Sequence, residues 1–290
     1  MPTQKIHLAI QQHYARVKAL GSKVGETWGE EAIHRFRVEV KKLRSCLRLA
    51  GATRTGLKSR LPRKLHTFYS MTGVVRNLQL QRKGMAEAAL RLDKPLPSPC
   101  MAVLEGRIQT AITMVKEYME VNNPLGHARA EWQVAIRRHE EARGITRFLE
   151  ERRDNLMSGV PFPDEAGLHA IRKVMKDILH VWPCFPDKET VLLLPDSWRS
   201  KGKLYSCTRR LGEFHDSCIK LQLLQDIHFI SAMEDNAQSL LEELRQLWFH
   251  DREEKREQLR HLLLPGWAPG KETSFGLGNL RTESYELHVD

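Results

Sequence analysis

The sequence predicts an all-α protein built from two related helical halves. Apolar residues recur at the three- and four-residue spacing of helices, and the strict alternation typical of strands is almost absent. One helical pattern of basic residues occurs twice, 135 positions apart at His34 and His169. A glycine-containing pattern occurs twice at the nearly equal offset of 139, at Gly73 and Gly212. A repeat of such long period indicates a chain made of two similar units.

The first half contains four predicted helices, which is enough for one bundle. Glycines are expected to end the first two, at Gly21 and Gly51, and Asn122-Asn123-Pro124 is expected to end the fourth. The proline-rich segment 95–99 reads as the loop between the third and the fourth. The four helices are predicted over residues 4–20, 29–50, 57–91 and 99–121.

The second half is predicted to repeat this order after residue 123. A linker at 158–164 follows its first, highly charged helix, and Pro183 with Pro186 ends the second. Its helices are predicted over residues 126–155, 164–182, 195–229 and 231–263. The expected organisation is therefore a first half at 1–123, a second half at 124–265 and an irregular tail at 266–290.

The composition fits a globular chain with an anionic partner. Hydrophobic residues make up 41% of the 290 residues, and 46 Lys and Arg against 36 Asp and Glu give a net charge of +10. Such a balance indicates a polyanionic partner or solubility alone, and the clustering of cations on particular faces favours the partner. No apolar run is long enough to span a bilayer, so no membrane partner is expected.

The cysteines and the N-terminal segment lead us to expect a cytoplasmic protein. Five cysteines are scattered along the chain with no C-x-x-C pair, which is typical of free thiols in a reducing compartment. The first residues contain no long apolar stretch of the kind that a secretory signal requires.

A ridge of basic residues is the most informative feature of segment 29–50. At roughly 100° per residue, five basic residues fall within an arc of about 80°, and they are His34, Arg37, Lys41, Arg44 and Arg48. The neighbouring arc is apolar and holds Ile33, Phe36, Val40, Leu43 and Leu47. Cations crowded at the edge of a core repel one another and lose hydration, which costs stability. The pattern therefore indicates a site for an anion of many charges.

Both patterns recur in the second half. His169, Arg172 and Lys176 have the spacing of His34, Arg37 and Lys41. The glycine pattern aligns four pairs of residues, which are Lys64 with Lys203, Gly73 with Gly212, Arg76 with His215, and Asn77 with Asp216. The glycines are expected to allow close helix contact, and Asn77 and Asp216 to cap a helix or hold a neighbouring cation.

With these paired motifs the chain resembles the CHAD domain family, the conserved histidine α-helical domain, over roughly residues 5–265. The first copy of the histidine motif is the closer match, whereas the second has Leu179 and Pro183 where the first has Arg44 and Arg48. The resemblance implies two four-helix bundles about a pseudo-twofold axis, with a basic cleft along that axis. It also implies a polyphosphate-binding module, sometimes joined to a triphosphate-tunnel enzyme domain.

The basic residues suit a polyphosphate chain, whose charges are regularly spaced and which presents no bases to read. Arginines fork two N–H donors onto neighbouring oxygens, and lysines act as mobile point charges. The candidate binding residues are His34, Arg37, Lys41, Lys42, Arg44, Arg48, Arg63, Lys64, Arg76, His169, Arg172, Lys173, Lys176, Lys203 and Arg210. Neighbouring cations should lower the pKa of both histidines, so we expect binding to tighten as pH falls.

Three other functions compete with polyphosphate binding. Nucleic-acid binding suits the charge, but aromatic residues make up 7% and are not interleaved with the ridges. A phosphoanhydride-processing enzyme would need carboxylates for Mg²⁺, and the ridges contain no pair of Asp or Glu. A helical scaffold whose charge serves only solubility is the third. We expect no catalytic residues, no metal ligands and no cofactor.

Overall fold

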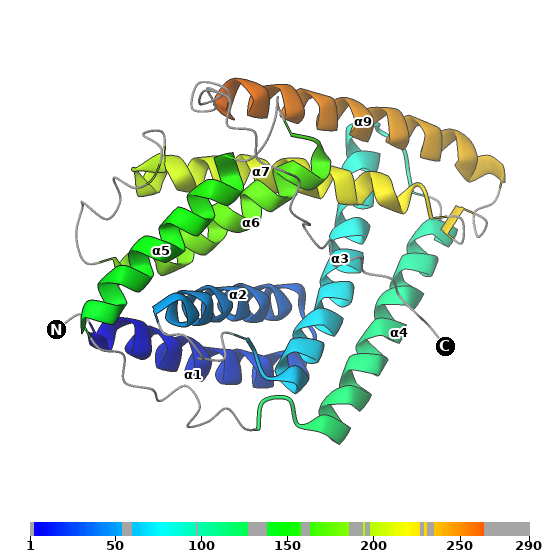
Figure 1. Ribbon diagram of the computed structural model, residues 1–290. Coiled ribbons are helices and arrows are strands. Elements are labelled where there is room, and N and C mark those ends of the chain that lie inside the picture. Colours follow the sequence, from blue (N-terminus) through cyan, green and yellow to red (C-terminus); the bar gives the residue numbers. More distant parts are fainter. Residues whose placement is uncertain are drawn as a thin grey trace.

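The protein is all-helical over the residues described by the computed structural model, with no strand among them (Figure 1). The structure describes residues 3–53, 60–96, 98–126, 138–157, 163–185, 194, 198–226, 229–230 and 235–263. Its helices are α1 Thr3–Thr27, α2 Glu30–Thr53, α3 Arg63–Arg91, α4 Ser98–Asn122, α5 Arg138–Met157, α6 Glu165–Val181, the short 3₁₀ helix η2 Trp182–Cys184, α7 Lys201–Leu223 and α9 Asp235–Leu263.

Several of the predicted helix ends are wrong. The helix predicted over 57–91 begins at Arg63, and α7 spans Lys201–Leu223 rather than the whole of the predicted 195–229. We expected Gly21 to end the first helix and Gly51 the second, but α1 continues to Thr27 and α2 to Thr53. Gly21 serves a close approach instead, because a Cβ at this position would lie 2.7 Å from both methyl carbons of Leu125. The predicted tail at 266–290 and parts of the predicted loops lie outside the described residues.

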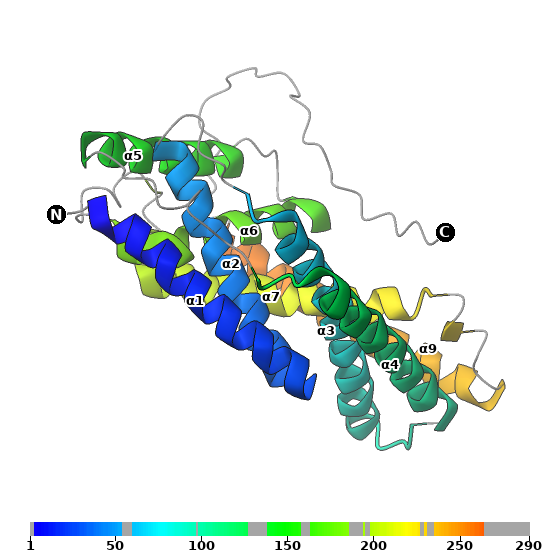
Figure 2. The same cartoon turned by 90° about the horizontal axis from the view of Figure 1, so that it is seen from below.

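Most of the helices lie side by side in pairs, and further packing between helices connects the pairs. Figures 1 and 2 show α1 beside α2 and α3 beside α4, and α9 runs along α7. Helix α2 also packs against α3, α5 and α6, and α6 packs against α7. Helix α2 therefore contacts both the N-terminal and the C-terminal helices, and α3 makes further contacts with α7 and α9.

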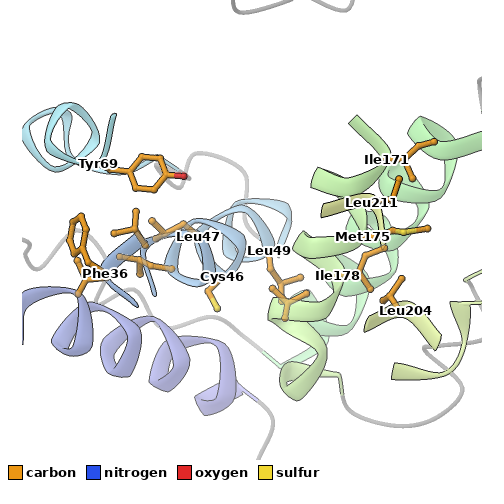
Figure 3. Packing of buried hydrophobic residues seen from close by; sticks show 14 of the residues in the cluster. Phe36, Cys46, Leu47, Leu49, Tyr69, Ile171, Met175, Ile178, Leu204 and Leu211 are labelled. Atoms are coloured by element: carbon orange, nitrogen blue, oxygen red, sulfur yellow. The ribbon is translucent and has the colours of Figure 1, made fainter. Parts of the chain in front are cut away.

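Buried side chains from both predicted halves form one large hydrophobic cluster. It includes Phe36 of α2, Phe68 of α3, Met175 of α6 and Phe214 of α7, and Figure 3 shows part of it between α2 and the later helices. A smaller cluster around Met85 and Trp248 joins α3, α4, α7 and α9. The division of the chain at residues 123 and 124 stays a prediction.

Candidate polyanion site

The apolar stripe of α2 is buried, as its spacing predicted. Ile33, Phe36, Val40 and Leu43 have no exposed surface, and Leu47 is 1% exposed. The stripe of α6 is buried in the same way through Leu168, Ile171, Met175 and Ile178. Because the basic residues occupy the adjacent arc of each helix, their stems lie at the edge of the core and their charged ends beyond it.

Five cations from α2 and α6 surround one another at Lys41. Loss of hydration lowers the pKa of Lys41 to about 7, and four positive charges add to the effect. Two belong to α2 (Arg37 and Arg44) and two to α6 (Arg172 and Lys176). We call these five residues the Lys41 cluster. Lys41 keeps exposed surface, so solvent and a ligand can reach it.

Four of the five residues of the cluster have no carboxylate partner in the part of the chain that the structure describes. Lys41, Arg44, Arg172 and Lys176 have no described Asp or Glu oxygen within ion-pair distance. The nearest negative group in electrostatic terms is Asp216 of α7, which acts on Arg172. Burial raises the pKa of Asp216, whereas the cations around it, Arg172 and Lys220 first among them, lower it.

Two imidazoles lie against the cluster. The ring centroids of His169 on α6 and His215 on α7 are 4.3 Å apart. Burial lowers the pKa of His169 to about 3, and His215 and the cations Lys173, Arg172 and Lys41 contribute. Burial also lowers the pKa of His215 to about 4, with Arg172, Lys41 and Lys173 contributing. Both rings are therefore neutral at pH 7 while the site holds no anion.

His34 has a different set of neighbours from this pair. Burial lowers its pKa, and Arg76 of α3 is the strongest of the cations that add to the effect, whereas Glu31 opposes it. The two predicted histidines thus have different surroundings: His34 is exposed and His169 is half-buried beside a second histidine.

The arginine of each histidine motif lies against the glycine of the glycine motif in the same half of the chain, Arg37 at Gly73 and Arg172 at Gly212. A Cβ added to Gly73 of α3 would lie 2.7 Å from Nη1 of Arg37, and one added to Gly212 of α7 would lie 3.4 Å from Nε of Arg172. Nη1 of Arg37 also donates a 2.5 Å hydrogen bond to the backbone oxygen of Tyr69. The glycine pattern therefore allows an arginine, as well as a helix, to approach closely.

Comparison with known proteins identifies the family. A sequence model of the CHAD domain matches residues 8–225. The chain belongs to the CHAD domain family. The crystal structure of the CHAD domain from the plant Ricinus communis superposes with a TM-score of 0.64 at 15% sequence identity, covering 90% of this chain and 91% of that one. This likeness confirms the all-α fold. No curated protein matches the chain.

Four of the predicted binding residues of this CHAD domain have neutralising or polar partners. Lys42 lies 3.1 Å from Glu39, Arg48 2.6 Å from Asp177 and Arg76 3.5 Å from Glu30. Arg210 donates a 3.1 Å hydrogen bond to Gln258 of α9. Their positive charges are thus partly used in holding helices together.

The remaining predicted residues lie at the margin of the site. Lys173 of α6 is exposed and acts electrostatically on His169 and His215. Arg63 and Lys64 occupy the first turn of α3 and Lys203 the first turn of α7, all three exposed. They are therefore the predicted residues least closely tied to the Lys41 cluster.

Sequence reasoning missed two residues that lie in the site. His215 was matched to Arg76 through the repeat, but only the packing of α6 on α7 shows that it contacts His169. Tyr69 was not singled out, although its ring lies 4.5 Å from the guanidinium carbon of Arg37 and 5.6 Å from that of Arg44. An aromatic residue four positions before the motif glycine was the available signal.

Two properties of the described residues concern other classes of function. No cluster of three or more His, Cys, Asp or Glu residues that could hold a metal ion occurs among them. None of the described helices has both the length and the apolarity to cross a membrane.

Proposed function

We propose that this CHAD domain binds inorganic polyphosphate at the Lys41 cluster without transforming it. The observation that carries the proposal is the meeting of Arg37, Lys41 and Arg44 of α2 with Arg172 and Lys176 of α6. Like charges at such close quarters destabilise the unliganded fold. A polyanion relieves this repulsion, so the free energy stored there contributes to its binding.

The arrangement suits a chain of phosphates better than a single small anion. The cations belong to two helices, which carry further basic residues: Lys173 on α6, and on α2 Arg48, which is paired with Asp177. A ligand with about one charge per phosphate can contact several of them in turn, and polyphosphate binding is a known property of the family. Guanidinium groups supply paired donors to adjacent oxygens, and ammonium groups supply charge.

We propose that these cations line a shared basic cleft. Lys41 and Asp216 both keep exposed surface, although neighbouring protein atoms withdraw each from bulk water and shift its pKa. Exposure combined with such surroundings supports a concave surface.

The pseudo-twofold arrangement of two bundles also belongs to this proposal. Two arginine–glycine contacts at equivalent motif positions support it.

Binding without catalysis follows from the groups that the cluster presents. Phosphoryl transfer assisted by Mg²⁺ uses several carboxylates, whereas Asp216 is the carboxylate that acts most strongly on Arg172 among the described residues. The site offers guanidinium, ammonium and neutral imidazole groups, which hold phosphate oxygens. All five cysteines are buried and no disulfide joins them, which supports a reducing compartment, and we propose the cytoplasm.

A pair of charge reversals tests the proposal. Lys41→Glu with Lys176→Glu should lower the affinity for long-chain polyphosphate by at least about a hundredfold in isothermal titration calorimetry, since two attractions become repulsions. The control is Lys18→Glu with Lys23→Glu on the exposed side of α1, which changes the net charge equally. Helical circular dichroism should stay unchanged in both. Equal affinity of the two double variants would refute the proposed site.

A competition experiment separates the proposal from nucleic-acid binding. Single-stranded DNA of the same number of phosphates should displace polyphosphate poorly, because the described part of the cluster presents no row of exposed aromatic rings for bases to stack on. Displacement at equal concentration would favour the nucleic acid as ligand.

A further inference from the structure

The guanidinium group of Arg37 is held from three directions by α3. Its Nη1 donates to the backbone oxygen of Tyr69 at 2.5 Å, and the ring of Tyr69 lies 4.5 Å from its central carbon. Gly73, one turn further along the same helix, leaves the space that the guanidinium fills. A Cβ there would lie 2.7, 3.0 and 3.1 Å from Nη1, Nη2 and Cζ of Arg37.

The same ring reaches the other members of the Lys41 cluster. Arg44, two turns after Arg37 on α2, has its guanidinium carbon 5.6 Å from the ring centre of Tyr69. Tyr69 also acts electrostatically on Arg172 of α6. Figure 3 shows the ring leaving α3 and extending beside α2 toward the side of α6 and α7. The ring therefore lies where the basic residues of the two helices meet.

The surroundings of Tyr69 fix the ring and the carbonyl oxygen. The residue is 8% exposed and belongs to the large hydrophobic cluster. Its backbone oxygen accepts a second hydrogen bond, 2.9 Å long, from Oγ1 of the buried Thr72. Cations stack favourably on aromatic faces, and a fixed acceptor orients a guanidinium further.

The second half of the chain builds this contact less tightly. Arg172 lies against Gly212, but a Cβ there would be 3.4 and 3.5 Å from its nearest atoms, which is ordinary van der Waals contact. The position that the repeat matches to Tyr69 is Thr208, which has no ring, and Nε of Arg172 is buried without a described hydrogen-bond partner. The two motif arginines are therefore held unequally.

We infer that Tyr69 and Gly73 are positioning residues, which fix the Arg37 guanidinium in the orientation that receives a phosphate group of the bound polyanion. The inference rests on the proposed function. An arginine fixed before binding loses less side-chain freedom when the anion arrives, which strengthens binding without a new contact. Gly73 serves the ligand through Arg37 rather than the packing of backbone on backbone.

Alanine at the two glycines provides a matched test. Gly73→Ala should weaken binding of polyphosphate about fivefold, because the new methyl group must displace the flexible end of Arg37. Gly212→Ala should change the affinity less than about twofold, since the methyl group fits beside Arg172. Both variants should melt at or above the temperature of the wild type, since alanine favours a helix over glycine. Equal affinity of Gly73→Ala and wild type overturns the inference.

Substitutions of the ring provide a second test that does not depend on the glycines. Tyr69→Phe keeps the ring and the backbone oxygen and should bind as the wild type does, whereas Tyr69→Leu should weaken binding about fivefold. The salt dependence supplies a readout that packing alone would not change. Tyr69→Leu should give a shallower slope of log K against log salt, by about one ionic contact, as Arg37 disengages. An unchanged slope contradicts the positioning role.

The failure of the inference is distinguishable from failure of the proposed function. If wild type binds no polyphosphate, the proposed function is wrong. If wild type binds and the Lys41/Lys176 reversal abolishes binding, but Gly73→Ala and Tyr69→Leu bind normally, the site stands and the positioning role is wrong.

Discussion

Four positively charged side chains act on Lys41, and their repulsion disfavours its charged form. Its pKa is lowered to about 7 by loss of hydration and by four neighbouring cations, although the side chain keeps exposed surface. The positive charge of such a lysine lowers the stability of the folded protein rather than raising it. Its presence therefore points to a role in binding, where an anion turns the same charge into an attraction.

Replacing Lys41 with methionine should stabilise the protein while weakening its binding. The long apolar stem is kept and the charge is lost, so the free energy of unfolding should rise by about 1 kcal/mol at pH 6. Urea denaturation measures this change, and calorimetry should show weaker binding of polyphosphate. Lys18→Met on exposed α1 should alter neither property, and a Lys41→Met protein less stable than wild type would contradict the argument.

The gain from Lys41→Met should depend on pH in a defined direction. The folded-state pKa lies below the unfolded one, so the unfolded chain binds more protons between about pH 7 and 10.5. Below pH 7 the charge of Lys41 lowers the free energy of unfolding by its full amount, and this loss disappears as pH rises toward 10.5. The difference between the variant and wild type should therefore be largest near pH 6 and small near pH 10, as measured by urea denaturation at both values.

Residue spacing predicted the basic ridges but not the contacts between distant segments. A turn of about 100° per residue places Arg37, Lys41 and Arg44 beside the buried stripe, and the structure shows the stripe buried. Tyr69 contacts Arg37 across 32 positions, and His215 contacts His169 across 46. Such contacts depend on how helices pack, which periodicity within one helix does not determine.

At the scale of elements, a buried polar network joins α2 to α5 and α6. Asp177 of α6 accepts a 2.8 Å hydrogen bond from Ser45 and lies 2.6 Å from Nη1 of Arg48, both on α2. Arg152 of α5 approaches the same carboxylate at 3.6 Å. Because α2 and α6 carry the Lys41 cluster, this network helps to set the distance between its two parts.

Removal of the carboxylate should destabilise the fold more than loss of a surface ion pair. Asp177→Ala removes the ion-pair partner of Arg48, a carboxylate near Arg152 and one acceptor of the Ser45 hydroxyl, and should cost about 3 kcal/mol of unfolding free energy. Asp154→Ala, which removes the exposed partner of Arg153, should cost less than about 0.5 kcal/mol. Chemical denaturation of both variants provides the measurement, and similar losses would show that the network contributes little.

Helix ends were predicted less well than helix interiors. Glycine after an amphipathic stretch favours a C-cap, yet Gly21 lies inside α1, where the absence of a side chain leaves room for Leu125. The break at Asn122-Asn123-Pro124 was predicted correctly, since α4 ends at Asn122 and Pro124 cannot continue a helix. Where local chemistry allows a helix either to end at a glycine or to continue through it, tertiary contacts decide between the two. The sequence alone does not show that Leu125 packs beside Gly21.

The positive net charge of the whole molecule is concentrated at the Lys41 cluster, where the structure describes few neighbouring carboxylates. The net charge is +10, and acidic residues of α2 and α6 pair with cations of other helices, as Glu39 does with His13 at 2.6 Å and Asp177 with Arg48 at 2.6 Å. The site then holds groups in their less charged forms, because His169, His215 and Lys41 all have lowered pKa values. A bound polyanion favours the charged forms of all three, so binding and proton uptake are linked.

Binding of polyphosphate should therefore take up protons and tighten as pH falls. Lys41 has a pKa of about 7 in the free protein, and a polyanion moves it back toward 10.5, so between pH 9 and 7 the complex holds up to about one more proton. The affinity should then rise by up to about tenfold per pH unit, while the internal phosphates of the ligand keep their charge. Below pH 6.5 the two imidazoles, with pKa values of about 3 and 4 when free, continue the trend.

Calorimetry in buffers of different ionisation enthalpy measures this uptake directly. At pH 8 the observed binding enthalpy should vary with the buffer, with a slope near one proton, and Lys41→Met should remove most of the slope. His169→Gln with His215→Gln should leave the slope at pH 8 unchanged but reduce it at pH 6, because histidine titrates in the lower range. Buffer-independent enthalpies at both values, with binding intact, would mean that the cations and imidazoles do not face the ligand, which would then have to bind elsewhere on the molecule.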